Sequence, residues 1–107
     1  MLYENIIMEL IVKGGDAKSK ALLAIGAAKK GNYSEAERLM QDCSQILIEA
    51  HEIQTDMIQD ELNGKSREPV NLLMVHGQAH LMNAMLISDL AKEFIELYKM
   101  VNGGVRK

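Results

Sequence analysis

The stretch that decides the fold is Ser34–Ile58, with the sequence SEAERLMQDCSQILIEAHEIQTDMI. It opens with Ser34 and Glu37 at the spacing of a capping box, in which two side chains bond the free backbone N–H groups at a helix start. Apolar residues then recur at steps of three and four, the spacing of one α-helical face. They are Ala36, Leu39, Met40, Cys43, Ile46, Leu47, Ala50, Met57 and Ile58. We therefore predict an amphipathic helix over residues 34–63.

Two further helices flank this one, because turn signals bound it on both sides. Gly31-Asn32 forms the first break, and the run from Asn63-Gly64 to Pro69 forms the second. We predict helices over residues 2–30 and 69–102, with Pro69 near the start of the last one, where its missing N–H leaves no helical bond unmade. Both breaks are short, so the three helices should form an antiparallel bundle.

Two glycine pairs predict irregularities. Gly14-Gly15 lies inside the first helix, where each glycine costs about 1 kcal/mol relative to alanine, and Asp16 could cap a new segment. We therefore expect a kink or a split there. Gly103-Gly104 predicts the end of the ordered part, with a disordered basic tail over residues 103–107.

The composition is that of one small all-α domain covering residues 1–107. A hydrophobic share of 48% and a charged share of 25% are globular values, and one Phe and no Trp favour helices over strands. A net charge of −3 argues against a nucleic-acid partner. The single Cys43 permits no internal disulfide. No membrane span or signal peptide is evident, so we expect a cytoplasmic protein.

The last helical stretch has more apolar residues than one face of a three-helix bundle needs. Its main stripe is Leu72, Ala79, Asn83, Leu86, Leu90, Phe94, Leu97 and Val101, and the surplus is Leu73, Met74, Val75, Leu81, Met82, Met85 and Ile87. We infer a homo-oligomer with this helix at its centre. The alternative is a loosely amphipathic monomer with scattered exposed methionines.

The histidines are the main candidates for chemistry. His76 and His80 lie four residues apart on one helical face, whereas His51 lies on the second helix. An ordinary hydrogen-bonded histidine at a core margin is the first interpretation of each. His76, however, sits in the most apolar segment, and Gly77 beside it lets another surface approach closely. We therefore interpret His76 as a nucleophile with room for a docking partner.

Other site types are weaker candidates. A histidine pair can bind a transition metal, but zinc requires three or four protein ligands, and the nearest acids, Glu68 and Asp89, are distant along the chain. Cys43 lies in the apolar stripe of the second helix, where a buried structural thiol is expected. The spacing alone thus predicts an oligomeric helical bundle with one unusual histidine.

The segment LLMVHGQAHLM, residues 72–82, resembles the active-site segment of the lactose/cellobiose-type IIA components of the bacterial sugar phosphotransferase system. Three other stretches agree in order and spacing, so the resemblance covers most of the chain. They are Gly15–Ser19, Glu49–His51 with Gln54-Thr55, and Ile95–Lys99.

This resemblance implies a homotrimer of three-helix bundles that works as a phosphocarrier. Such proteins accept a phosphoryl group on one histidine from the phosphocarrier HPr and pass it to the cognate IIB component. The IIB component phosphorylates a lactose-, cellobiose- or chitobiose-type sugar during uptake through the membrane component IIC. The matching histidine is His76, with transfer expected at Nε2.

Neighbouring residues receive roles from the same resemblance and from chemistry. His80, Gln78 and Gln54 are candidate donors to the phosphoryl group, because mid-helix amides are already bonded, and we expect some donors to come from a neighbouring subunit. Met74, Met82 and Met85 are the expected apolar docking rim, since methionine adapts to successive partners.

One position departs from the family pattern. An Asp commonly stands three residues after the phosphorylated histidine, and three copies of it bind a metal on the trimer axis; here that residue is Ala79. We expect no metal, no other cofactor and an apolar axis. The alternatives are a weakened trimer, or a polar axial layer supplied by His80 or Asn83.

Two other functions remain as alternatives to the phosphocarrier. One is a non-catalytic regulatory or scaffolding oligomer derived from the same scaffold, which phosphorylation of His76 would exclude. The other is a metal-storing bundle, which the lack of carboxylates near the histidines disfavours.

Overall fold

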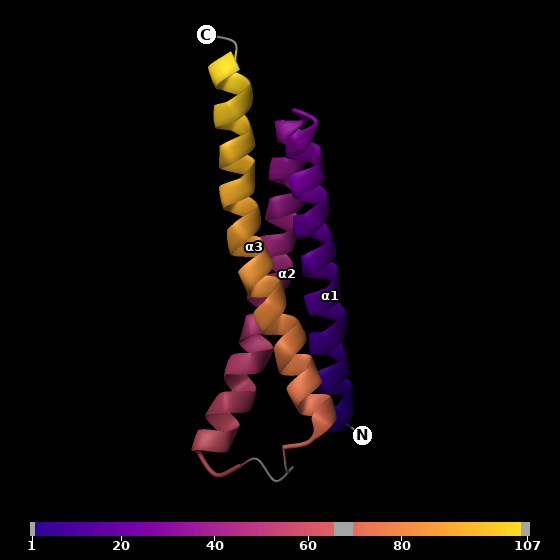
Figure 1. Ribbon diagram of the computed structural model, residues 1–107. Helices are drawn as coiled ribbons and strands as arrows, with labels where there is room; N and C mark the ends of the chain where they lie inside the picture. Colours follow the sequence, from indigo (N-terminus) through magenta and orange to yellow (C-terminus); the bar gives the residue numbers. More distant parts are fainter. Residues whose placement is uncertain (1, 66–69, 106–107) are drawn as a thin grey trace.

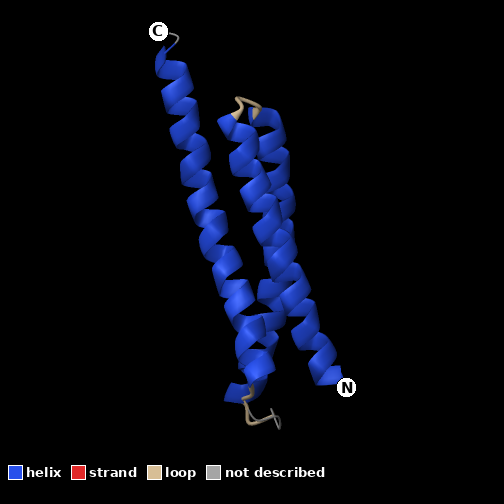
Figure 2. Cartoon of the chain, turned by 45° about the vertical axis from the view of Figure 1, so that its right-hand side comes forward, coloured by secondary structure: helices blue, strands red, loops and turns tan. Residues whose placement is uncertain are grey.

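The computed structural model describes residues 2–65 and 70–105 of the chain. A helix forms in each of the three stretches where the apolar spacing predicted one. The elements are α1 (Leu2–Lys29), α2 (Tyr33–Leu62) and α3 (Leu72–Val105). Figure 1 shows α2 antiparallel to both other helices, in a rod of 60 × 21 × 20 Å. Figure 2 shows that the described residues contain no strand. The predicted all-α antiparallel bundle is confirmed.

Two glycine turns connect or end the helices. After α1, Gly31 adopts a left-handed φ of 81°, and the backbone bonds from Asn32 N to Ala27 O and from Gly31 N to Ala28 O are both 2.9 Å long. This is a Schellman motif, which glycine permits because it lacks a Cβ. Gly64 repeats the motif after α2 with a φ of 70°, and the bond from Lys65 N to Asp60 O measures 2.8 Å.

The predicted capping box at Ser34 is wrong. The N-cap of α2 is Asn32, without a side-chain cap bond, and the helix already begins at Tyr33. The glycine turn holds Asn32 against α1 through its backbone, so the start of the helix is fixed before Ser34 is reached. Ser34 is therefore inside the first turn and exposed.

The expected split at Gly14-Gly15 is also wrong, since α1 runs unbroken through both residues. The reason is a close contact with α3. A Cβ on Gly14 would lie 3.0 Å from the carbonyl carbon of His80 and 3.2 Å from its Cβ, whereas one on Gly15 would meet nothing within 4 Å. Gly14 thus serves tight helix packing, and that packing outweighs its weak helix propensity.

The third helix differs from its prediction at both ends. It begins at Leu72 rather than at residue 69, because the side chain of Asn71 caps it by accepting a 2.9 Å bond from Met74 N. Pro69 lies outside the described residues. At the other end the helix continues through residues 103–105 of the expected tail, and residues 106–107 are outside the described part.

The core consists of a larger and a smaller cluster. The larger is built mostly from alanines: Ala17, Ala21, Ala24, Ala28, Ala36, Leu39, Met40, Cys43, Ala84, Ala91 and Ile95. The smaller consists of Leu10, Ala50 and Leu81. Small side chains bring three helices close together in the first cluster. Burial there raises the pKa of the Cys43 thiol, which agrees with the structural role expected for it.

A row of apolar side chains on α3 stays exposed among the described residues. We call this row the α3 stripe, and its members are Leu72, Val75, Ala79, Met82, Leu86, Leu90, Phe94, Leu97 and Val101, all of them exposed. Leu86 retains 57% of its accessible surface and Leu97 retains 51%. This helix does carry more apolar surface than the chain covers, but mostly on other residues than predicted. The exposed row is largely the predicted main stripe, and of the predicted surplus only Val75 and Met82 are exposed.

Candidate functional site

His76 and His80 form a contacting pair on the first half of α3. Their Nε2 atoms are 3.1 Å apart, within hydrogen-bond distance, and the ring planes meet at 79° with centroids 4.5 Å apart. His76 is exposed and His80 is half-buried. One ring donates an N–H and the other accepts it, so Nε2 of His76 is the meeting point of the two side chains.

Two glycines set the depth at which this pair lies. Gly77 is buried, and a Cβ there would lie 3.0 Å from Cγ2 of Ile7 on α1. Gly14 on α1 makes the corresponding close contact with the backbone of His80. The surface that Gly77 admits is therefore α1 of the same chain. It anchors α3 at the histidines and leaves the exposed side of His76 open.

The two glutamines meet on a different side of α3. Gln54 Nε2 on α2 donates a 2.7 Å bond to Gln78 Oε1 and lies 3.8 Å from the sulfur of Met82. Because an α-helix turns about 100° per residue, His76 and Gln78 point about 160° apart. Within one chain the structure thus brings Gln54 to Gln78, and His76 to His80, but it does not join the two pairs.

The three methionines of the expected docking rim lie on the glutamine side of α3. Met82 is 54% exposed and borders the glutamine pair, whereas Met74 is half-buried. Met85 packs against the smaller core cluster. The three side chains therefore do not encircle His76 of their own chain.

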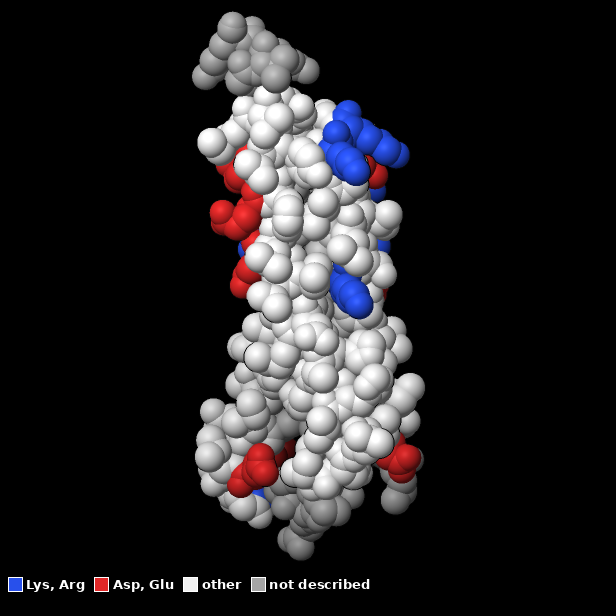
Figure 3. All heavy atoms as spheres, in the orientation of Figure 1, with Lys and Arg blue, Asp and Glu red and all other residues white. Residues whose placement is uncertain are grey.

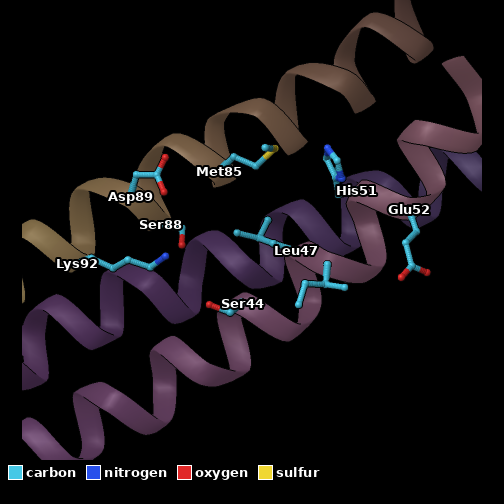
Figure 4. Close-up of a pocket in the computed structure, with 9 residues that line it drawn as sticks. Ser44, Leu47, His51, Glu52, Met85, Ser88, Asp89 and Lys92 are labelled. Atoms are coloured by element: carbon cyan, nitrogen blue, oxygen red, sulfur yellow. The ribbon is translucent and has the colours of Figure 1, made fainter.

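A cleft of about 640 Å³ separates α2 from α3 in the middle of the bundle (Figure 4). Its lining is Ser44, Leu47, Ile48, His51 and Glu52 on α2 and Met85, Ser88, Asp89 and Lys92 on α3. The sequence analysis named His51 only within a motif on the second helix that matches the family, and it missed the polar residues that share this cleft. Their three-, four- and seven-residue spacing was visible, but the separation of the two helices was not.

Charge is sparse around the histidines and concentrated elsewhere. Residues 70–88 contain no Asp, Glu, Lys or Arg. On the side of the molecule seen in Figure 3, the middle of the lower half shows no charged side chain. Away from it, Lys13 and Glu49 join α1 to α2 at 2.8 Å. The hydrogen bond from Lys13 lowers the pKa of Glu49, and the same bond raises the pKa of Lys13.

The residues present do not fit a carboxylate-bound metal. Ala79 is exposed in the first third of the α3 stripe, and a methyl group has no lone pair to offer a cation. Among the described residues no three His, Cys, Asp or Glu side chains gather closely enough to hold a metal ion. The histidine pair supplies two nitrogens, which is fewer than a zinc site requires.

The described chain is thus a three-helix bundle with an exposed histidine pair on α3. The chain belongs to the family described as PTS system, Lactose/Cellobiose specific IIA subunit, which it matches over residues 5–99. The family resemblance inferred from residues 72–82 is thereby confirmed.

Relatives and solved structures agree with this assignment. The chain is 48% identical over 98 residues to the lichenan-specific phosphotransferase enzyme IIA component of Bacillus subtilis, covering 92% of this chain and 88% of the relative. It is similar to the crystal structure of the cellobiose-specific enzyme IIA from Bacillus anthracis, with a TM-score of 0.88, 40% identity and coverage of 92% and 90%. A IIA(chitobiose)–HPr complex of the Escherichia coli phosphotransferase system matches with a TM-score of 0.79, 39% identity and coverage of 92% and 95%.

The described helices are not of the kind that crosses a membrane. None of them, over the described residues, combines the length and apolarity that crossing a bilayer requires.

Proposed function

We propose that this chain is a phosphocarrier that accepts a phosphoryl group from HPr on Nε2 of His76 and passes it to a cognate IIB component. The observation that carries the proposal is the position of His76, exposed on an uncharged face of α3 with its Nε2 atom 3.1 Å from Nε2 of His80. Membership of the IIA family and the similarity to a IIA(chitobiose)–HPr complex support HPr as the donor.

The transfer needs one lone pair and well-placed donors. Neutral His76 with its proton on Nδ1 offers the Nε2 lone pair to phosphorus. The new N–P bond forms as the bond from phosphorus to the donor atom breaks, so no proton has to leave His76 before the attack. His80 first releases its hydrogen bond to this atom. Its Nε2–H is then within reach of the phosphoryl oxygens, whose negative charge it stabilises.

Further donors come from a second copy in this proposal. The histidine pair and the glutamine pair flank the α3 stripe on opposite sides. In a ring of identical copies that present the stripe to a common axis, the histidine side of one α3 faces the glutamine side of the next. Gln78 uses its carbonyl oxygen to accept from Gln54, so its own N–H groups are not used in that bond. The homotrimer thus completes the site.

Successive docking explains the apolar surroundings. Met82 of a neighbouring copy would border His76 together with uncharged α3 surface, and a flexible thioether adapts to two partners in turn. The carrier works in the cytoplasm beside HPr and reaches the membrane component IIC only through IIB. The family range sets the substrate as a lactose-, cellobiose- or chitobiose-type sugar.

Intact mass measurement tests the proposal. The protein is incubated with phosphoenolpyruvate, enzyme I and HPr, and one acid-labile phosphoryl group per chain is expected. His76→Ala should gain none. His51→Ala is the matched control, because His51 is also an exposed helical histidine, and it should gain one. Absence of phosphoryl uptake by the folded wild type would overturn the proposal and favour the regulatory or scaffolding oligomer.

A further inference from the structure

The part of the α3 stripe around Ala79 offers no ligand for a cation. Leu72, Ala79 and Leu86 are seven residues apart and therefore point in nearly the same direction. Val75 and Met82 flank Ala79 at steps of four and three, and both are about half exposed, at 52% and 54%. This layer is thus hydrocarbon and thioether, without a hard oxygen donor.

We propose that copies of this chain pack along the α3 stripe through an apolar layer at Ala79 that binds no metal ion, so that assembly is independent of divalent cations. The inference rests on the trimer proposed above and adds to it how the axis is held together. It also departs from the carboxylate-bound metal that the family resemblance implies.

A second copy of this chain is the occupant that the stripe fits. Its members recur at steps of three and four over most of a 34-residue helix, the spacing by which identical helices interlock. Over residues 70–88, the first half of the stripe, the absence of Asp, Glu, Lys and Arg leaves no charge for a complementary, differently charged partner to match. An apolar surface of this length is rare on a monomer.

The chemistry of the layer decides its metal dependence. A shared cation on a symmetry axis needs an oxygen ligand from every copy, and Mg²⁺ or Ca²⁺ prefers carboxylates for this purpose. Carboxylates without the cation would repel one another in a buried layer. Methyl groups neither bind a cation nor repel one another. Ala79 therefore removes both the metal ligand and the repulsion. Asn83, one turn further along α3, contributes a neutral amide.

The experiment measures the mass of the assembly by analytical ultracentrifugation, first in EDTA and then with Mg²⁺ alone. Wild type should keep one and the same oligomeric mass in both buffers. Ala79→Asp should assemble at least tenfold more weakly in EDTA at neutral pH, and Mg²⁺ or protonation at low pH should restore it. Ala79→Asn is the matched control, since it has nearly the same shape as aspartate without the charge, and it should be indifferent to EDTA.

Three results would overturn the inference. They are a wild type that dissociates in EDTA and reassembles with Mg²⁺, an Ala79→Asp variant that assembles in EDTA as tightly as wild type, and a wild type that is monomeric in every buffer. Ala79 is exposed in the single chain, so the variants should fold, and circular dichroism checks this. Because no phosphoryl donor is present, failure of His76 phosphorylation would leave this result standing.

Discussion

The two halves of the bundle differ in the size of their core and in the charge on α3. The half around Ala24 has a large alanine-rich cluster contributed by all three helices, and α3 is charged there from Asp89 onward. The half that holds the histidines relies on the smaller cluster around Leu81, and its α3 surface is uncharged. The α3 stripe runs along both halves, since Leu90, Phe94 and Leu97 are exposed beside the alanine-rich cluster. The halves therefore differ in the size of their core and in the charge next to the stripe.

The sharpest test of this comparison is Leu81→Ala. Leu81 is fully buried in the smaller cluster, and the cavity should cost about 3 kcal/mol. Urea unfolding at fixed protein concentration measures the loss. Leu23→Ala serves as control, because Leu23 is 61% exposed on α1, and it should cost well under 1 kcal/mol. Equal losses for both variants would mean that Leu81 does not hold the histidine half together.

The alanine-rich half should instead be sensitive to added volume. Ala24 is fully buried where helices are packed closely, so Ala24→Val should cost about 2 kcal/mol through overpacking and weaker helix propensity. Leu22→Val on the same helix, at a half-exposed position, should show only the propensity cost of about 0.5 kcal/mol. If Ala24→Val loses no more free energy of unfolding than Leu22→Val, the alanine-rich half has free space and is not closely packed.

The smallest effect belongs to the ion pair where the halves meet. The hydrogen bond from Lys13 lowers the pKa of Glu49 in the folded chain below its ordinary value of 4.5. Glu49 therefore adds stability above about pH 4.5, and this contribution is lost as the pH falls through the lowered pKa. Both side chains are exposed enough for solvent to screen them.

Glu49→Gln tests this pair. Its Tm should lie within about 2 °C below that of wild type at pH 7. The difference should shrink as the pH falls through the lowered pKa of Glu49, because protonated Glu49 no longer attracts Lys13. Added salt should shrink the difference at pH 7. A Tm difference that stays constant from pH 7 to pH 3 would assign the effect to packing instead of charge.

Most of the fold could be predicted from periodicity, because apolar spacing determines helices of this length. The errors fell where a tertiary contact outweighed a local signal. The local sequence predicts that Gly14 breaks the helix, yet its close contact with the backbone of His80 makes it part of the packing of α1 against α3. Ser34 reads as a cap, yet the turn at Gly31 sets the helix start.

The candidate site was predictable where it depends on spacing within one helix, but not where it depends on how two helices pack. The contact between His76 and His80 follows from a spacing of four residues. The bond from Gln54 to Gln78 does not, since it depends on how α2 lies against α3. The cleft that contains Asp89 and Lys92 was missed for the same reason.

The buried thiol of Cys43 has a practical consequence. Because only a thiolate attacks alkylating reagents and burial raises the pKa of this group, the folded chain should resist modification. Cys43 is the only cysteine in the sequence and belongs to the alanine-rich cluster. Its alkylation rate under native conditions therefore reports how often that cluster opens, so the native sequence already contains a probe of local unfolding.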